Sequence, residues 1–310
     1  MTIPIIDISD LISGKRESFS TATAAIGRAC RQIGFFYVTG HGVPQSLMEQ
    51  TMLASQALFA APLAVKEAVR FSASTGNRGY IPMRGEALDP SKPADLKEAF
   101  NIGLDLAPDD PEIIAKARFR ALNLWPEVEG FRETALAYFD AAWSLGRKLH
   151  QAFAGDLGKL DRPLATLRLL HYPPAPANAE LGQMGAGEHT DYGCVTLLLT
   201  DDVGGLEVRT RYGHWIKAPY VPGAFICNIG DCLMRWTNDT YVSTPHRVVN
   251  PQRRERYSIA FFLDPNPDTV VGCLPTCIDA GRPAKYPSIR GDDYLQSRLD
   301  PTYAESGLGA

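Results

Sequence analysis

Apolar positions in the first half of the chain follow the spacing of helices. Between Phe131 and Phe153 an apolar residue recurs every three or four positions, which places these residues on one face of a helix. The same spacing predicts two further helices, over residues 19–32 and 44–59. Short apolar runs predict two interleaved strands, over residues 3–8 and 34–38. We therefore expect residues 1–163 to form an N-terminal region that is mainly helical.

The pattern changes near residue 164 to short apolar segments separated by Gly, Pro, Asn and Asp. These segments predict strands over residues 166–171, 194–200, 206–209, 215–218, 224–229, 248–250 and 257–263. Closely spaced strands without intervening helices favour an antiparallel sandwich or jelly roll over a parallel sheet. We expect residues 164–268 to form this jelly roll. Residues 269–310 form a C-terminal extension, and from Asp279 onward its pattern is too weak to assign a helix.

Composition and charge exclude several classes of protein. Hydrophobic residues make up 45% of the 310 residues, so the chain has enough apolar surface to fold. The net charge of −4 offers no basic surface for nucleic acid or anionic lipid, so neither is an expected partner. The longest apolar stretch, residues 57–65, is too short to span a bilayer and contains Pro62.

The start of the chain and its cysteines indicate an intracellular protein. No basic segment followed by an apolar run begins the sequence, so we expect no secretory signal. The six cysteines are expected to be reduced thiols packed as small apolar groups. Cys273 and Cys277 have the spacing of half a zinc site, but no second half completes it. We predict a cytoplasmic monomer.

Residues 72–93 are rich in Gly, Pro and Ser and are predicted to form a long loop. Long loops within compact domains are often functional lids. This one carries Arg78 and Tyr80 between glycines. We expect it to cover a reactive site and to become ordered when substrate binds.

Two histidines and one aspartate in the strand-rich half form a candidate metal site. His189 and Asp191 are two residues apart, so on an extended strand they project to the same side. His246, far away in sequence, supplies the second imidazole. Two histidines and one carboxylate on one face of a metal leave three adjacent positions open, which is typical of non-haem Fe(II) oxygenases.

A candidate carboxylate receptor follows ten residues after His246. Arg256 and Ser258 again share one side of a strand. A guanidinium holds a carboxylate through two parallel hydrogen bonds, and a hydroxyl supplies a third. The pair is suited to a small dicarboxylate whose other end chelates the metal. Each motif alone occurs by chance, and only their combination favours a function.

These motifs resemble those of the iron(II)- and 2-oxoglutarate-dependent oxygenases of the isopenicillin N synthase-like family. The resemblance runs nearly end to end, through residues 3–7, 34–36, 40–44, 97–100, 189–191, 228–231, 243–247 and 256–258. It implies a double-stranded β-helix core with N-terminal helices. It also implies His189, Asp191 and His246 as iron ligands, with Arg256 and Ser258 binding the distal carboxylate of 2-oxoglutarate.

Tyr172 matches a tyrosine that often touches the 2-oxoglutarate carboxylate in this family. Plant members often carry Asn two residues earlier, where this chain has Leu170. The resemblance implies oxidative decarboxylation of 2-oxoglutarate to succinate and CO2, with hydroxylation or a related oxidation of a small molecule. Fe(II), O2 and 2-oxoglutarate are the expected cofactors, with ascorbate as a reductant. No protein acid or base is required, so we expect no catalytic residue beyond the metal centre.

Three alternatives remain open at this point. The first is an oxidase of the same family that does not use 2-oxoglutarate, in which Arg256 and Ser258 hold a substrate carboxylate. The second is a non-catalytic jelly-roll protein that binds a carboxylate ligand. The third is a zinc hydrolase that uses the same three side chains with bound water.

Candidates for the substrate pocket are six polar and aromatic residues: Arg78, Tyr80, Phe100, His171, Arg235 and Phe262. The two arginines among them favour an acidic substrate. Other noticeable residues are assigned structural or surface roles. We expect His41 and Asn228 with Asp231 to support turns, and His150 and His214 to be exposed to solvent.

Overall fold

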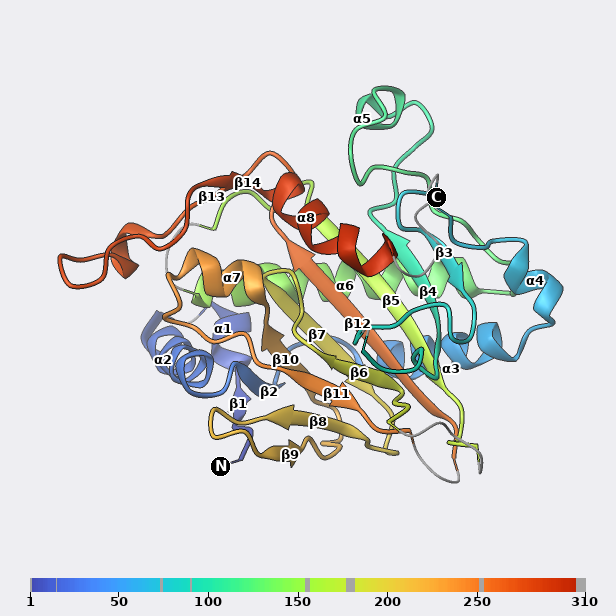
Figure 1. Ribbon diagram of the computed structural model, residues 1–310, viewed down its shortest axis with the longest axis horizontal. Coiled ribbons are helices and arrows are strands. Elements are labelled where there is room, and N and C mark those ends of the chain that lie inside the picture. Colours follow the sequence, from blue (N-terminus) through green and yellow to red (C-terminus); the bar gives the residue numbers. More distant parts are fainter. Residues whose placement is uncertain are drawn as a thin grey trace.

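The computed structural model describes residues 2–14, 16–72, 75–89, 91–153, 157–176, 182–250 and 254–304. Two sheets facing each other form its centre (Figure 1). Eight strands in the order β1-β2-β10-β7-β12-β5-β4-β3 form the larger sheet, which is antiparallel except for the β1–β2 pair. Its strands are β1 (Ile5–Asp7), β2 (Phe35–Thr39), β3 (Gly79–Ile81), β4 (Glu98–Gly103), β5 (Leu164–Tyr172), β7 (Val195–Thr200), β10 (Phe225–Ile229) and β12 (Arg256–Asp264).

The smaller sheet has the order β6-β11-β8-β9. Its strands are β6 (Ala186–His189), β8 (Leu206–Arg209), β9 (Trp215–Lys217) and β11 (His246–Val248). From β5 to β12 the chain passes back and forth between the two sheets, with β8 and β9 as a hairpin within the smaller one, which is the jelly-roll arrangement predicted from the sequence. A separate hairpin pairs β13 (Val270–Val271) with β14 (Ile289–Arg290).

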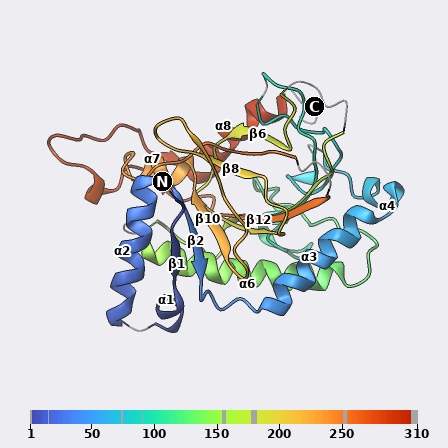
Figure 2. The same ribbon diagram turned by 90° about the horizontal axis from the view of Figure 1, so that it is seen from below.

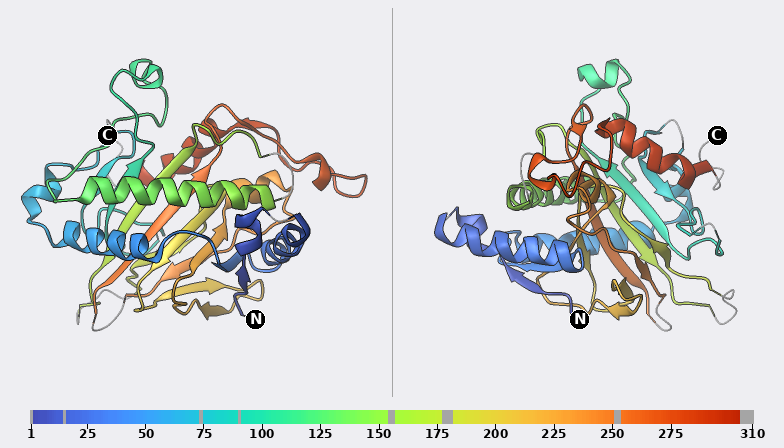
Figure 3. Two further views of the ribbon diagram at one scale, coloured as in Figure 1. Left: turned by 180° about the vertical axis from the view of Figure 1, so that it is seen from behind. Right: turned by 60° about the vertical axis from the view of Figure 1, so that its left-hand side comes forward.

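Helices cover one face of the larger sheet. Figure 3 shows α3 and α6 running side by side across its back, and Figure 2 shows α8 on the opposite side of the molecule. The helices are α1 (Ser9–Ser13), α2 (Arg16–Gln32), α3 (Gln45–Ala60), α4 (Leu63–Glu67), α5 (Pro111–Ile114), α6 (Phe131–Ala152), α7 (Asp231–Trp236) and α8 (Gly291–Ala304), with a 3-10 turn at Pro275–Cys277. None of the helices in these described ranges has the length and apolar character needed to cross a membrane.

Each strand of the larger sheet presents alternate residues to two different environments. On β12, Ile259, Phe261 and Leu263 pack into the core beneath the helices, where Phe261 meets Phe139 of α6 with ring centroids 5.0 Å apart. Ala260 and the other even-numbered residues of β12 face the smaller sheet. We call these two sides the helix face and the inner face. The alternation follows from the two-residue period of a strand.

The predicted strands and long helices are confirmed, with small shifts at their ends. The strand expected at 248–250 lies two residues earlier, at β11. The elements that were not predicted are the strands β3, β4, β6, β13 and β14 and the helices α1, α4, α5, α7 and α8. β3 lies within residues 72–93, so the prediction of one long loop there is wrong; residues 73, 74 and 90 lie outside the described part.

His150 is the clearest correction among the histidines. It was expected to be solvated, but it is buried, and its Nδ1 lies 3.0 Å from the Gly146 carbonyl oxygen. The reason is that α6 packs against the sheet on one side and against α3 and α2 on others, so little of its surface remains exposed. His214 is exposed as expected, and His41 supports the turn after β2 through hydrogen bonds with Val43 and Gly223.

Candidate active site

A cavity lies between the two sheets, on the inner face of the larger one. Its wall is formed by strands of both sheets, by residues 77–97 and by Leu295 and Leu299 of α8. Its two ends differ in composition. One end contains Arg256 and Ser258 of β12 and Tyr172 of β5, which pairs with Arg256. The other contains Phe119, Arg120 and Arg78, whose guanidinium lies beside Gly103, which pairs with Thr166 near the start of β5.

His189, Asp191 and His246 meet in the wall of this cavity. The register of β6 and β11 places His189 opposite His246, and their ring centroids are 4.3 Å apart. Oδ1 of Asp191 lies 3.6 Å from Nε2 of His246 and 3.9 Å from Nε2 of His189. One ligand atom from each residue lies within 4.8 Å of the other two, so the three can reach a single metal ion.

The neighbours of these side chains leave the three ligand atoms available. Nδ1 of His189 lies 2.7 Å from the Gly187 carbonyl oxygen, and Nδ1 of His246 lies 3.1 Å from that of Thr244. Because a carbonyl only accepts hydrogen bonds, each Nδ1 carries a proton, which leaves Nε2 as the metal-binding atom of each ring. This donor set fits a divalent iron with open coordination positions.

Asp191 is held by two donors on neighbouring strands. Its Oδ2 accepts hydrogen bonds from Thr196 Oγ1 at 2.5 Å and from Asn228 Nδ2 at 2.6 Å. Oδ1 is thereby turned toward the imidazoles. Asn228 was expected to fix a turn, but it lies within β10 and orients this carboxylate.

Electrostatics favour the metal-binding state of Asp191 and His189. Burial, together with the neighbouring His246, lowers the pKa of His189 to about 3. Burial raises the pKa of Asp191, but attraction to His246 outweighs it and holds that pKa well below its usual range. The carboxylate is therefore ionised, and the His189 imidazole neutral, at neutral pH. Burial lowers the pKa of His246, but attraction to the Asp191 carboxylate outweighs it and raises that pKa, so without a metal this imidazole favours the protonated form.

Arg256 lies buried at one end of the cavity, with 1% of its surface exposed. Its Nε donates to the Gly204 carbonyl at 2.6 Å, Nη1 donates to Ser258 Oγ at 3.2 Å, and the guanidinium lies 4.6 Å from the Tyr172 ring centroid. Among the described residues no carboxylate lies within ion-pair distance of it. A buried cation without a counter-ion is costly, so this end is suited to an anionic ligand.

The six candidates for the substrate pocket separate by the face on which they lie. Arg78 and Phe262 line the cavity, whereas Tyr80, Phe100, His171 and Arg235 are not among its lining residues.

Tyr80 and His171 lie on the helix face, where both contact the Glu98 carboxylate, at 2.6 and 2.7 Å. Phe100 packs edge-on against Phe131. Arg235 lies on α7, with its guanidinium over the Tyr286 ring. The chain neighbours of His171 on β5, Leu170 and Tyr172, line the cavity instead.

Several residues of the cavity wall were not predicted. They include Asn101, Phe119, Arg120, Arg168, Asp264, Leu295 and Leu299. Arg168 carried a signal, because it is a charged residue among leucines in a predicted strand. The others lie on elements that the pattern did not reveal or at positions without a distinguishing neighbour.

The segment before β4 is fastened to the cavity wall by charges. Glu86 pairs with Arg168 and, at 3.5 Å, with Lys97, and both cations are buried or nearly so. Asp95 accepts the Gly187 N–H at 2.8 Å, next to the carbonyl that holds His189. Arg78 is buried, whereas Arg84 is exposed. Whether this segment opens as a lid remains a prediction.

A second group of possible ligands lies beside the cavity. Cys194, Cys232 and Asp264 are all buried and bring one ligand atom each within 4.8 Å. Burial raises the pKa of the Cys194 thiol and raises that of Asp264 to about 6. The Cys194 thiol is therefore protonated at neutral pH, which is not the state that binds a metal.

Comparison with known proteins agrees with this geometry. Residues 3–128 match the family model described as non-haem dioxygenase in morphine synthesis N-terminal. Residues 163–265 match that of the 2OG-Fe(II) oxygenase superfamily.

Similar proteins cover nearly the whole chain. The 2-oxoglutarate-Fe(II) type oxidoreductase hxnY of Emericella nidulans is 37% identical over 98% of this chain and 91% of its own. Homoarginine-6-hydroxylase 2-ODD-233 of Oryza sativa is 35% identical over 96% of both chains. The solved structure of a full-length Neurospora crassa protein in complex with alpha-KG has a TM-score of 0.83 at 31% identity, covering 96% of this chain and 95% of that one.

The match in sequence, in fold and in the meeting of two imidazoles with a carboxylate leads to one conclusion: the chain belongs to the iron(II)- and 2-oxoglutarate-dependent oxygenases of the isopenicillin N synthase-like superfamily, enzymes that couple decarboxylation of 2-oxoglutarate to oxidation of a small molecule.

Proposed function

We propose that His189, Asp191 and His246 bind the iron and that Arg256, Ser258 and Tyr172 bind the distal carboxylate of 2-oxoglutarate. The observation that carries this assignment is the approach of the three ligand atoms within 4.8 Å, in a cavity that also contains a buried arginine. When bound, Fe(II) and 2-oxoglutarate supply the oxidising chemistry.

The protein's own groups bind and orient in this proposal. Arg256 neutralises the carboxylate, Ser258 donates a further hydrogen bond, and the Tyr172 ring supports the guanidinium. Thr196 and Asn228 fix the direction of Asp191. No group of the chain has to move a proton for the oxidation, so we assign no acid or base.

We also propose a division of labour along the chain. Residues 164–268 supply the iron site and the 2-oxoglutarate site. Residues 1–163 and 269–310 supply much of the opposite end of the cavity, through Arg78, Phe119 and Leu295. Variation in these outer regions would then change the substrate without changing the cofactors.

An anaerobic titration tests the assignment. Fe(II)-loaded protein should develop a weak visible metal-to-ligand absorption band when 2-oxoglutarate is added. Admission of O2 should then give succinate, slowly without substrate and faster with it. Absence of both signals would contradict the assignment. O2 consumption that does not require 2-oxoglutarate would instead indicate an oxidase that uses Arg256 and Ser258 for its substrate.

We further propose that the enzyme acts as a cytoplasmic monomer without nucleic acid or membrane partners. The net charge of −4 supports this, because it provides no attraction to polyanions. Light scattering on the purified protein, alone and with a nucleic acid or an anionic vesicle added, checks the oligomeric state and the two excluded partners, and cell fractionation checks the location. A dimer mass or a salt-sensitive complex would contradict it.

A further inference from the structure

The cavity wall carries more cations than its own acids neutralise. Five cationic residues line it, and three of them have carboxylate partners. Arg168 and Lys97 pair with Glu86, and Arg120 lies 3.1 Å from Glu112. Arg256 is the fourth cation, and its expected counter-ion is 2-oxoglutarate. The fifth, Arg78, has no such assignment.

Arg78 is bonded only to main-chain oxygens. It is 4% exposed, and its terminal nitrogens donate to the carbonyl groups of Gly76, Asn77 and Phe119 at 3.0–3.3 Å. Its Nε is buried and has no hydrogen-bond partner. Among the described residues no carboxylate lies within ion-pair distance of this guanidinium.

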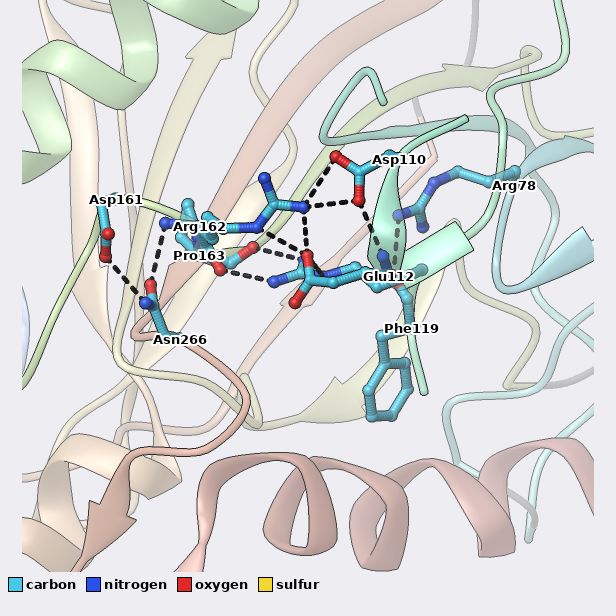
Figure 4. A network of polar contacts seen from close by, with 9 residues as sticks. Arg78, Asp110, Glu112, Phe119, Asp161, Arg162, Pro163 and Asn266 are labelled. Carbon is cyan, nitrogen blue, oxygen red and sulfur yellow. Dashed lines mark hydrogen bonds and ion pairs between the residues drawn. The ribbon is translucent and has the colours of Figure 1, made fainter. Parts of the chain in front are cut away.

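The nearest acidic network is already engaged. Figure 4 shows Asp110 and Glu112 turned toward Arg162, while Arg78 contacts the main chain at Phe119. Arg162 bonds both oxygens of Asp110, at 2.8 and 3.0 Å, and its Nε donates to Glu112 at 2.7 Å. The charge of Arg78 is therefore not compensated from this side.

The guanidinium of Arg78 lies on the inner face of the larger sheet. A Cβ placed on Gly103 would overlap this guanidinium, so the absence of a side chain at that position of β4 makes room for it. Gly103 pairs with Thr166 of β5, and Thr166 pairs with Phe262 of β12. Phe262 in turn pairs with Thr196 of β7, which orients the Asp191 carboxylate. Three strand spacings, about 14 Å, thus separate Gly103 from Thr196. A small molecule can bridge that span.

We infer that the primary substrate carries a carboxylate that pairs with Arg78, which holds the rest of the molecule beside the iron. This inference rests on the proposed function. The apolar side chains at this end (Phe119, Leu164, Phe262, Leu295 and Leu299) are suited to an apolar body between the carboxylate and the oxidised carbon. Of the five N–H groups of Arg78 three are used by the carbonyl groups, so one on Nε and one on Nη2 remain, and two donors match the two oxygens of one carboxylate.

Burial, with repulsion from Arg120, lowers the pKa of Arg78 to about 10. The residue therefore remains charged at neutral pH, and the cavity at this end is positive. Like Arg256, it is a buried arginine of the cavity that lacks a counter-ion among the described residues.

A panel of small carboxylic acids, each paired with its primary amide, tests the inference. Acceleration of succinate formation is measured for wild type, Arg78→Gln and Arg78→Lys. We expect the accelerating compounds to be acids, with KM at least tenfold lower than for their amides. Arg78→Gln should remove that preference, and Arg78→Lys should retain part of it.

The two variants separate charge from structure, because both lose the forked contacts to the three carbonyl groups but only one loses the charge. Three results would overturn the inference. They are an equal loss of the acid preference in both variants, an acid preference that survives Arg78→Gln, and a panel without any preference for acids. Succinate formed without substrate reports the proposed function separately, so a failure there is distinguishable. Thermal unfolding of each variant excludes loss of the fold as the cause.

Discussion

The two faces of the larger sheet differ in whether every buried charge described above has a partner within the protein. On the helix face, Glu98 accepts hydrogen bonds from Tyr80 and Lys66 at 2.6 and 2.9 Å, and lies 2.7 Å from His171. The Glu98 carboxylate is therefore paired with cationic or hydrogen-bonding groups of the protein itself. On the inner face, Arg256 has no carboxylate within ion-pair distance among the described residues.

This difference indicates which buried charges serve the fold and which serve ligands. A satisfied cluster contributes to a single packing arrangement, whereas an unsatisfied cation costs stability until a ligand binds. The two kinds of residue alternate along the same strand, one position apart. His171 and Tyr172 are neighbours on β5 and belong to different sites.

The largest expected effect is on the inner face, from Asp191→Ala. Removing the only carboxylate of the triad should abolish iron binding and all succinate formation. The matched variant Asn228→Ala leaves the ligand but removes a donor that orients it. It should weaken iron binding by roughly 10- to 100-fold. Metal titration distinguishes the two, and equal loss in both would point to misfolding.

Arg256→Leu should retain iron and lose affinity for 2-oxoglutarate. An unpaired buried carboxylate costs about 2–5 kcal/mol, or roughly 30- to 5,000-fold in binding. The visible band at increasing 2-oxoglutarate concentrations measures the change. Arg256→Lys serves as the control that retains charge. An unchanged affinity in the Leu variant would remove Arg256 from the 2-oxoglutarate site.

On the helix face, Lys66→Met should change stability and leave the cofactors alone. The ammonium group lies 2.9 Å from Glu98 in a buried pair, and loss of one partner leaves an uncompensated charge. The free energy of unfolding should fall by about 3 kcal/mol. Urea denaturation measures it, and a 2-oxoglutarate titration checks the second half. A weaker 2-oxoglutarate affinity would show that the two faces are not independent.

The smallest effect concerns the pH dependence of Asp264. Burial raises its pKa from 3.8 to about 6 in the folded protein. The folded state therefore favours the protonated form, so this contribution to stability is complete below pH 3.8 and is lost as pH rises through about 6. Between pH 5 and 8 the loss is about 1 kcal/mol.

The variant Asp264→Asn should lack that loss. The difference in unfolding free energy between metal-free wild type and this variant isolates the residue, because the other titrating groups are common to both. A difference that is constant from pH 5 to 8 would contradict the raised pKa.

The sequence predicted the inner face better than the helix face. Arg256 and Ser258 are two residues apart, and the period of a strand is enough to place them together. Nothing in the sequence shows which of His171 and Tyr172 faces the cavity, because that depends on the register of β5 against β12. Helix α8 has few apolar positions, so its sequence pattern did not predict a helix. Its role became visible only in the structure, where Leu295 and Leu299 line the cavity.

One residue, Gly187, joins the segment before β4 to the iron site. Asp95 accepts its N–H, and its carbonyl oxygen orients His189. We therefore expect the free energy of binding iron to be coupled to that of holding this segment against β6, and such linkage is reciprocal. Any contact that stabilises the segment against β6 should then raise the affinity for iron, and bound iron should stabilise the segment by the same factor. The expected consequence is that iron alone, before any substrate binds, slows cleavage of the chain at the exposed Arg84 by a protease.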